Sequence, residues 1–532
     1  MPTLIFRNAN LLSFHNGFVN KGYDALAIQG NRITAIGNWN EVGAMVQPGT
    51  RVIDAGGKTI MPGFNDSHIH IWKVGNLSTF MLDVRQAGSL DELLDMIATY
   101  HQNNPHLNWI TARGFNEAAW KDGRMPDKTD LDKVVKNKPI FLIRTCAHIA
   151  VANTQAIKLS GITEHTQTPD GGVIYKDAGG KPTGIFSETA LGLVSKHIPA
   201  YTKNELKMMV KAARQQLYQL GITAATDPAV DPMLLQAYYE MNAANELGFR
   251  LNAIPILLPD GGAKPFEAPA LYKSDWFNVN TVKFFSDGGL SGKTAALKQP
   301  YKNTQEHGVL RLQPEQFLQL AHEAMENGLG IATHAIGDAA IEFVVNSYVK
   351  LAKIFPNISN RIEHLGLPEV GHLEQMAKYQ IAASMQTIFI SELGKNFRQY
   401  LGQEYLDNCY PVKSVLKHGI LTALSSDAPV VSNLNPVKGM YAAVNRLDNE
   451  GFEIAPNEAI TIAEALKAYT ASAATISKTP QFGTLEKGQL ADFIILNQNP
   501  LSTVSADIQS IKVEQTYVDG KRVYAAHEAV LA

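Results

Sequence analysis

Residues 61–70 have the sequence Met61-Pro62-Gly63-Phe64-Asn65-Asp66-Ser67-His68-Ile69-His70. Pro62 and Gly63 favour a turn that leads the chain into a short apolar strand. Alternate residues of a strand point to the same side, so His68 and His70 would project together from one face. Two neighbouring neutral imidazoles are suitable ligands for a divalent transition metal. An isolated pair of this kind is more often two strand histidines satisfied by local hydrogen bonds, so its interpretation depends on the rest of the chain.

The composition is that of an ordinary globular enzyme. Of the 532 residues, 45% are hydrophobic and 18% are charged, and the length favours one large domain with something attached. The formal net charge of -3 gives no reason to expect nucleic acid or acidic membranes as partners. Cys146 and Cys409 are the only cysteines, which excludes a disulfide framework and fits a reducing compartment. We find no apolar run of membrane-spanning length and no secretion signal, and we expect a cytoplasmic protein.

The two ends of the chain share a pattern of short strands. The first sixty residues contain strand-like segments bounded by glycine or asparagine turns, including a hairpin signal at residues 29–31. Similar segments return only near the C-terminus, at Ala491–Leu496 and Gln515–Val518. We therefore predict a small β-sandwich domain formed by residues 1–60 together with 476–532.

Between residues 61 and 475, predicted strands alternate with helical patterns such as Pro314–Asn327 and Asp338–Ile354. The eight candidate strands are Ile60–His70, Ile222–Asp227, Arg250–Leu258, Thr281–Ser286, Gly330–His334, Arg361–His364, Ile381–Gln386 and Leu421–Ser426. This alternation predicts an α/β fold, a parallel (β/α)8 TIM-like barrel. The gap of about 150 residues after the first strand is too long for an ordinary connection. It contains a helical pattern at Leu90–Asn103, and we predict an inserted α+β subdomain at about residues 76–205.

Metal-binding and acid–base residues stand at or near the ends of these strands. The active site of such a barrel lies at the carboxyl ends of its strands. The residues in question are His68 and His70 (first strand), Lys283 (fourth), His334 (fifth), His364 (sixth) and Asp427 (directly after the eighth). This regular placement favours a shared metal centre.

Six segments carry a resemblance to a known family. They are Pro62-Gly63-Phe64 through His70, Val282-Lys283 with Asp287-Gly288, His334-Ala335-Ile336-Gly337-Asp338, Arg361-Ile362-Glu363-His364, Ser426-Asp427-Ala428-Pro429, and Gly483–Gly488 with Ala491-Asp492-Phe493. In their order and spacing, which cover nearly the whole chain, the sequence resembles the amidohydrolase superfamily. The similarity is to its amidohydrolase-3 branch, which includes N-substituted formamide deformylase.

The resemblance implies a centre of one or two divalent metal ions per chain, with zinc the expected metal. His68 and His70 would bind the more buried ion, and Asp427 would contact it as well. His334 and His364 would bind a second, more exposed ion. The alternative for His334 and His364 is a role as helix-capping or core histidines.

Lys283 would bridge the two ions as an N6-carboxylated lysine, a carbamate formed with carbon dioxide. Carbamate formation requires a neutral amine, and desolvation among apolar neighbours lowers a lysine pKa. The alternative is a lysine paired with a carboxylate such as Asp287. Asp338 and Glu363 are expected to fix histidine tautomers or to cap helices.

Asp427 would be the catalytic residue. It would take a proton from the metal-activated hydroxide during attack and give it to the leaving nitrogen. Its alternative role is that of a cap for the next helix. Five residues are candidates for substrate binding, each with an alternative role in packing or loop structure. They are Trp72, Arg113, Trp120, His148 and Glu188.

The predicted function is that of a metal-dependent hydrolase. It would use a metal-activated hydroxide to cleave a C–N bond of a small amide, an N-substituted formamide or a cyclic amide. A deaminase or an esterase or lactonase on the same scaffold is the main alternative, because the same activated water serves all of them. A catalytically silent binding or regulatory protein is a third interpretation, which the complete ligand set opposes. The expected partner is a small-molecule substrate, and assembly into a homo-oligomer is compatible with each interpretation.

Overall fold

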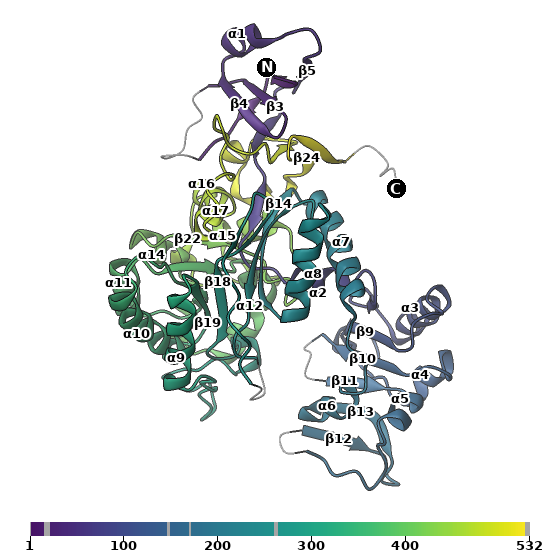
Figure 1. Ribbon diagram of the computed structural model, residues 1–532. Helices are drawn as coiled ribbons and strands as arrows, with labels where there is room; N and C mark the ends of the chain where they lie inside the picture. The colour runs from purple at the N-terminus through teal and green to yellow at the C-terminus, as the bar shows by residue number, and fades with distance from the viewer. Residues whose placement is uncertain (1, 15–21, 146–148, 170–171, 260–263, 527–532) are drawn as a thin grey trace. The chain divides into compact units, whose positions relative to one another are not determined.

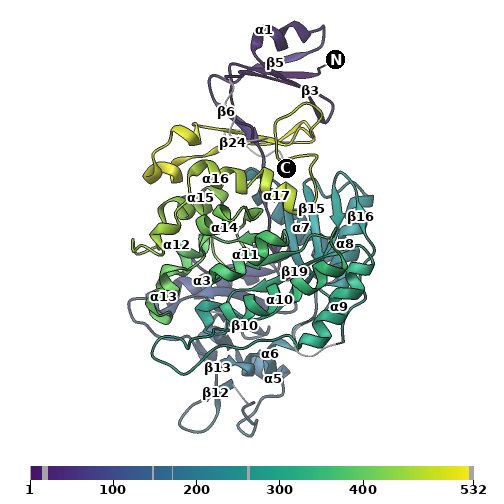
Figure 2. The same ribbon diagram turned by 90° about the vertical axis from the view of Figure 1, so that its left-hand side faces the viewer.

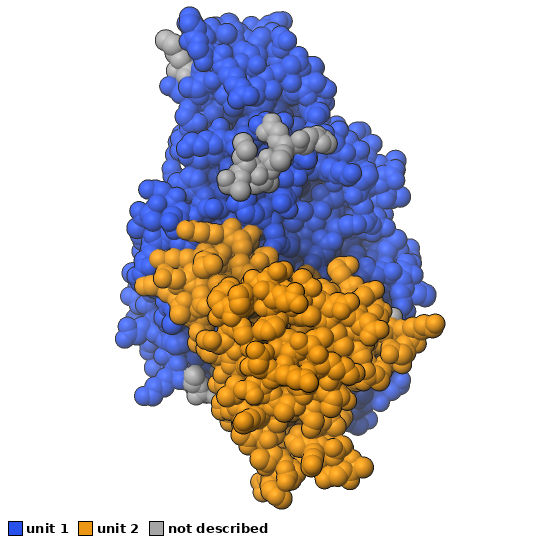
Figure 3. All heavy atoms as spheres, turned by 90° about the vertical axis from the view of Figure 1, so that its right-hand side faces the viewer, with its two compact units in different colours: residues 1–71, 214–532 blue, residues 72–213 orange. Residues whose placement is uncertain are grey.

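The computed structural model describes residues 2–14, 22–145, 149–169, 172–259 and 264–526. The chain folds into two compact units, coloured blue and orange in Figure 3. Unit 1 contains Met1–Ile71 and Arg214–Ala532, and unit 2 contains Trp72–Ala213. No helix in the described ranges combines the length and apolar character needed to cross a membrane.

Parallel strands form the centre of unit 1, and the predicted α/β class is confirmed. The strands are β7 (Phe64–Asp66), β14 (Ile222–Val230), β15 (Arg250–Pro255), β18 (Thr281–Phe285), β19 (Gly330–Ala335), β20 (Arg361–His364), β21 (Ala382–Met385) and β22 (Thr422–Leu424). Within the described residues they lie in two five-stranded sheets, with strand orders β16-β17-β15-β14-β7 and β18-β19-β20-β21-β22, and not in one closed sheet. β16 (Tyr272–Lys273) is the antiparallel edge strand of the first sheet.

The two sheets are connected at both ends. A single residue, Asn280, separates β17 (Phe277–Val279) of the first sheet from β18 of the second. A parallel bridge also joins Ile256, just after β15, to Lys283 in β18. At the opposite ends, Asp427 N donates to His68 O at 2.8 Å and links the segment after β22 to the segment after β7. The carboxyl ends of strands from both sheets therefore meet in one region.

The predicted first strand, Ile60–His70, is two strands that belong to different sheets. Gly63 separates β6 (Thr59–Pro62) from β7. A Cβ atom at residue 63 would collide with the side chain of Thr223, so glycine permits this close approach. The histidine pair lies beyond β7 in an irregular segment, and the prediction that it alternates along a strand is wrong.

Helices cover the outer face of the second sheet. Figures 1 and 2 show α9 (Pro314–Glu326), α10 (Asp338–Ile354) and α11 (Val370–Lys378) along it. α10 has the predicted bounds, because its buried residues recur every three or four positions from Ala340 to Leu351. Unit 1 also contains α8 (Pro232–Ala243), α12 (Ile388–Tyr400), α13 (Gln403–Asp407) and α15 (Pro436–Asn445).

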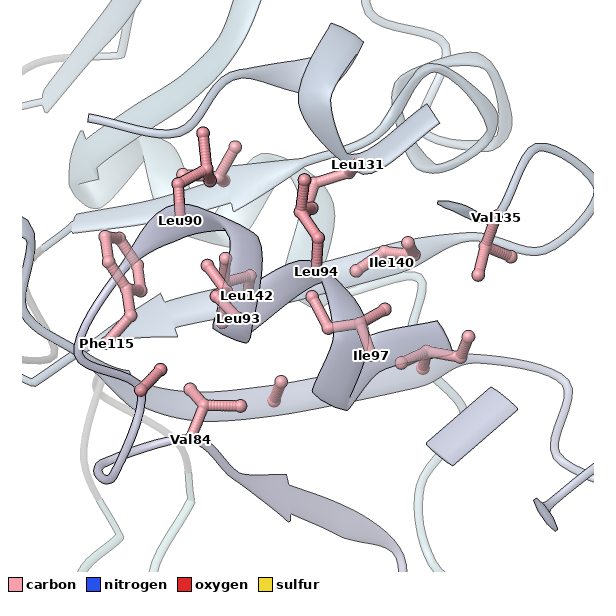
Figure 4. Packing of buried hydrophobic residues seen from close by; sticks show 14 of the residues in the cluster. Val84, Leu90, Leu93, Leu94, Ile97, Phe115, Leu131, Val135, Ile140 and Leu142 are labelled. Carbon is pink, nitrogen blue, oxygen red and sulfur yellow. The ribbon is translucent and has the colours of Figure 1, made fainter. Parts of the chain in front are cut away.

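Unit 2 has its own sheet and core. Its described strands have the order β12-β13-β11-β10-β9-β8. They are β8 (Met81–Asp83), β9 (Ile110–Phe115), β10 (Ile140–Arg144), β11 (Ile149–Ala152), β12 (Gly172–Lys176) and β13 (Pro182–Glu188). Figure 4 shows Leu93 and Ile97 of α3 (Leu90–Asn103) packed with Ile140 and Leu142 of β10. Ser89 caps α3 by accepting a hydrogen bond from Glu92 N at 3.2 Å.

Strands from both ends of the chain pair with each other. β6 lies antiparallel to β23 (Phe493–Leu496), in a sheet with β2 (Asn10–Leu11), β24 (Val513–Val518) and β25 (Lys521–Ala525). A second sheet has the order β4-β3-β1-β5, from Arg32–Gly37, Ala25–Gln29, Leu4–Arg7 and Arg51–Asp54. Phe6, Phe493 and Tyr517 pack together, with ring centroids 4.5–5.5 Å apart.

A buried ion pair connects β15 to the C-terminal strands, and its removal should lower the free energy of unfolding. Arg250 donates to Asp492 at 2.7 and 2.9 Å and to Asp519 at 3.0 Å. Replacing Arg250 with Met would leave the buried Asp492 carboxylate without its cation. We expect the free energy of unfolding to fall by about 3–5 kcal/mol, measured by urea denaturation. The exposed Arg51 replaced by Met is the control, and a similar small loss in both variants would contradict the prediction.

Candidate metal centre

The predicted ligands come together at the carboxyl ends of the parallel strands in unit 1. Most of them are buried, and His334 is partly exposed. The set is His68 and His70 after β7, Lys283 in β18, His334 in β19, His364 at the end of β20, and Asp427 after β22.

Asp427 is the point at which the first histidine pair converges. Its Oδ1 lies 3.4 Å from His68 Nε2 and 3.3 Å from His70 Nε2. One donor atom each from His68, His364 and Asp427 lies within 4.8 Å of the others. Ligands about 2 Å from a tetrahedral zinc ion are themselves a little over 3 Å apart. The three side chains are therefore close enough together to contribute ligands to a metal centre.

His68 is held as a neutral donor. Its Nδ1 is hydrogen-bonded to the Glu363 carboxylate, which also receives the guanidinium of Arg361. Burial lowers the pKa of His68 to about 4, although Glu363 and Asp427 oppose this shift. Burial would raise the pKa of Glu363, but Arg361 and His68 hold it well below its usual value. Because Nδ1 donates to a carboxylate, His68 Nε2 keeps its lone pair for a cation, and Glu363 makes the contact expected of a tautomer-fixing residue.

In the second pair, His334 and His364 donate hydrogen bonds to two different acceptors. His334 Nε2 lies 3.0 Å from the carbonyl oxygen of Gly288, so Nε2 carries the proton and Nδ1 the lone pair. His364 Nδ1 lies 2.7 Å from Oε1 of Gln386, a residue that the sequence analysis did not identify. The two histidine rings are adjacent, with centroids 4.4 Å apart. Burial lowers the pKa of His364 well below its usual value, which keeps this ring neutral.

Lys283 is enclosed within the strands. Its side chain is fully buried, and its Nζ has no hydrogen-bond partner among the described residues. Asp287, the alternative partner, instead accepts hydrogen bonds from the backbone N–H groups of Ala296, Ile336 and Gly337 at 2.8–3.1 Å. Burial lowers the pKa of Lys283 to about 8, against the opposing charges of Glu363 and Asp427. The lysine therefore has the reduced basicity that carbamate formation requires.

The backbone is strained at two of these positions. His364 has φ +73° and Asp427 has φ +55°, in the left-handed region that residues other than glycine rarely adopt. Each such residue costs about 1–3 kcal/mol and persists where the surrounding structure holds it in place, often at a functional site.

The capping alternatives for the two histidines and Asp427 are not observed. The next described helix after Asp427 is α15, and its N-cap is Asn435. The N-cap residues of α10 and α11 are Gly337 and Glu369, so His334 and His364 do not cap these helices. Of the two roles expected for Asp338, the hydrogen bonds favour capping: its carboxylate accepts from Ala339 N in the first turn of α10 at 3.0 Å, and from Lys298 N at 2.9 Å and Tyr405 Oη at 2.7 Å.

The substrate-binding candidates belong to unit 2, except His148, which lies outside the described residues. Trp120 is buried within that unit, where its Nε1 donates to Ala87 O at 2.9 Å. Trp72 packs on Tyr201 with ring centroids 6.2 Å apart. Arg113 lies in β9, and Glu188 ends β13 with φ +51°.

Comparisons with known proteins cover nearly the whole chain. A family model described as "Amidohydrolase family" matches residues 51–524. The chain is 29% identical over 542 residues to N-substituted formamide deformylase of Arthrobacter pascens, with 98% of each chain covered. An uncharacterized metal-dependent hydrolase from Pyrococcus horikoshii OT3 has a similar structure, with 25% identity, a TM-score of 0.79, and coverage of 94% of this chain and 99% of that one. Atrazine chlorohydrolase TrzN from Arthrobacter aurescens TC1, solved with zinc, shares the fold at 14% identity and a TM-score of 0.51, with 99% and 97% coverage.

Proposed function

The chain belongs to the amidohydrolase family and is a metal-dependent hydrolase, and from this premise we propose that it cleaves a C–N bond of a small amide, N-substituted formamide or cyclic amide. One observation carries the proposal. Donor atoms of His68, His364 and Asp427 lie within 4.8 Å of one another, Asp427 Oδ1 also lies 3.3 Å from His70 Nε2, and the nearby Lys283 is buried with a lowered pKa. The formamide deformylase of Arthrobacter pascens supports the substrate class.

The donors present fit a zinc centre. Histidine nitrogens and a carboxylate oxygen are ligands that zinc prefers, and the tautomer of His68 leaves Nε2 available. We propose that His68, His70 and Asp427 hold one ion and that His334 and His364 hold a second. Lys283 would stand between them as a carbamate. Bound zinc would supply a water acidified toward neutral pH and a polarised substrate carbonyl.

Asp427 would move the proton. The oxygen of the attacking water forms a bond to the carbonyl carbon while the Asp427 carboxylate accepts its proton. As the C–N bond breaks, Asp427 returns that proton to the nitrogen, so the products are a carboxylic acid and an amine. The position of Asp427 Oδ1 between His68 and His70 supports this role.

We also infer that the parallel strands of the two sheets together form a (β/α)8 barrel. The single-residue connection at Asn280, the bridge between Ile256 and Lys283, and the hydrogen bond from Asp427 N to His68 O support closure at both edges. Strand ends brought into one ring would explain why residues distant in sequence share one site.

Metal content and substrate range test the proposed function. Protein purified without added metal should contain about two zinc ions per chain and should hydrolyse members of a panel of N-substituted formamides, amides and cyclic ureas. The His68→Ala and His70→Ala double variant is the inactive control. If the purified protein contains no metal and added zinc does not increase its activity, the proposed metal centre is wrong. Turnover of esters or aminopurines alone would overturn the amide substrate class.

A further inference from the structure

Gln386 occupies a buried position between two partners of different chemistry. It directly follows β21 and its side chain is inaccessible to solvent. Its Oε1 lies 2.7 Å from His364 Nδ1, and its Nε2 donates to Ser425 Oγ at 2.8 Å. A buried amide must satisfy both of its ends, so each contact constrains the other.

Hydroxyl groups fix the direction of these hydrogen bonds. Ser67 Oγ donates to Leu424 O at 3.1 Å and lies 2.7 Å from Ser384 Oγ. With the Ser67 proton on Leu424 O, Ser384 donates to Ser67 and accepts from Ser425, 3.3 Å away, since each hydroxyl has one proton. Ser425 then has two acceptors for its own proton, Ser384 Oγ and Met385 O at 3.3 Å. Its oxygen can in turn accept the amide N–H of the glutamine.

The reversed amide would be unfavourable. Ser384 O lies 3.5 Å from the glutamine Nε2, and a carbonyl can only accept a hydrogen bond. With the amide reversed, two carbonyl oxygens would face each other in a buried site. The amide oxygen of Gln386 therefore faces His364, and an oxygen acceptor there requires the proton on His364 Nδ1.

We propose that Gln386 is a positioning residue that holds His364 in the Nδ1–H tautomer and so presents its Nε2 lone pair to the metal centre. The serine chain, which begins beside His68, holds the amide in the required orientation. The acceptor behind His364 is neutral, whereas the acceptor behind His68 is the Glu363 carboxylate. The tautomer follows from the hydrogen bonds alone, and only its effect on metal binding rests on the proposed function.

The tautomer can be tested without metal or substrate. Apo-protein labelled with ¹⁵N-histidine would be studied by long-range ¹H–¹⁵N NMR, with the His364 signals identified by their loss in His364→Gln. Wild type is expected to show the Nδ1–H form. Gln386→Leu should lose it as the predominant form, and Gln386→Glu should retain it because a carboxylate also accepts from Nδ1. A proton on Nε2 of His364 in wild type, or an unchanged tautomer in Gln386→Leu, would overturn the proposal.

Zinc affinity provides the second readout. In competition with a chromophoric chelator, the Gln386→Leu variant should bind one zinc ion about 10–100-fold more weakly than wild type and the other with unchanged affinity. Gln386→Glu should restore most of the affinity. Gln375→Leu, a partly exposed glutamine on α11, is the matched control and should bind as wild type does. Equal zinc affinity in Gln386→Leu and wild type would contradict the inference. If wild type binds no zinc, the proposed function fails, and the NMR result still decides the role of Gln386.

Discussion

Replacement of Asp427 with Asn is expected to lower kcat by about 10³-fold while the metal content stays at the wild-type level. Asparagine has nearly the same size and keeps one oxygen in place, but its amide cannot accept and return a proton. It also tolerates the left-handed backbone at this position, where φ is +55°. The substitution therefore removes the proton transfer and preserves the local geometry. Steady-state kinetics on the best substrate of the panel, with zinc content measured on the same sample, would check it.

Asp338 provides a matched control for the Asp427 variant. Its carboxylate is also buried, and among the described residues it is hydrogen-bonded to Lys298, Ala339 and Tyr405 rather than to the four proposed histidine ligands. Asp338→Asn should therefore keep turnover close to wild type. Full activity in Asp427→Asn would exclude the proton-transfer role. Loss of zinc together with activity would show that the residue acts chiefly as a ligand.

Most strand ends could be predicted from the sequence because the strands carry a local signal. β19 and β21 are short, mainly apolar segments with polar residues at or just beyond their ends, whereas β20 has Ile362 as its one apolar residue; the predicted bounds of all three agree to within one or two residues. The predicted strand at 381–386 even ended on Gln386. A glutamine at a strand end has no specific meaning in a single sequence, and its role appears only when β20 and β21 bring it against His364.

Tertiary contacts explain the remaining differences. The first predicted strand was too long because Thr223, about 160 residues away, is the side chain that requires Gly63. The sequence analysis did not predict β17, whose parallel pairing with β15 is a tertiary contact. The pair of Arg361 and Glu363 also depends on context, because the second partner of Glu363 is His68, which follows β7 and lies 295 residues earlier in the chain.

Replacement of Lys283 with Met should reduce the zinc content to about one ion per chain and lower kcat by about 10³-fold. The variant should also lose any dependence of zinc binding on bicarbonate. A pKa of about 8, against an ordinary 10.5, leaves about a tenth of the lysine neutral at pH 7 and most of it neutral at pH 9. Wild-type apo-protein should therefore take up its second zinc ion faster with added bicarbonate and with rising pH over this range. Bicarbonate-independent uptake of two ions by wild type would exclude the carbamate.

The same substitution should raise the free energy of unfolding of the apo-protein although it lowers activity. A loss of activity in this variant would therefore not be caused by misfolding. A lysine whose folded pKa is about 8 and whose unfolded pKa is 10.5 binds fewer protons when folded between these values. Stability thus rises with pH from about 8 to 10.5 and is lowest, and level, below pH 8. At pH 7 the buried ammonium costs about 3 kcal/mol, which methionine of similar length would remove. Urea denaturation of both apo-proteins at pH 7 and pH 10 would measure this, with a smaller difference expected at pH 10. A variant less stable than wild type at pH 7 would contradict the prediction, whereas a more stable one would indicate that Lys283 is retained for the metal centre at the expense of stability.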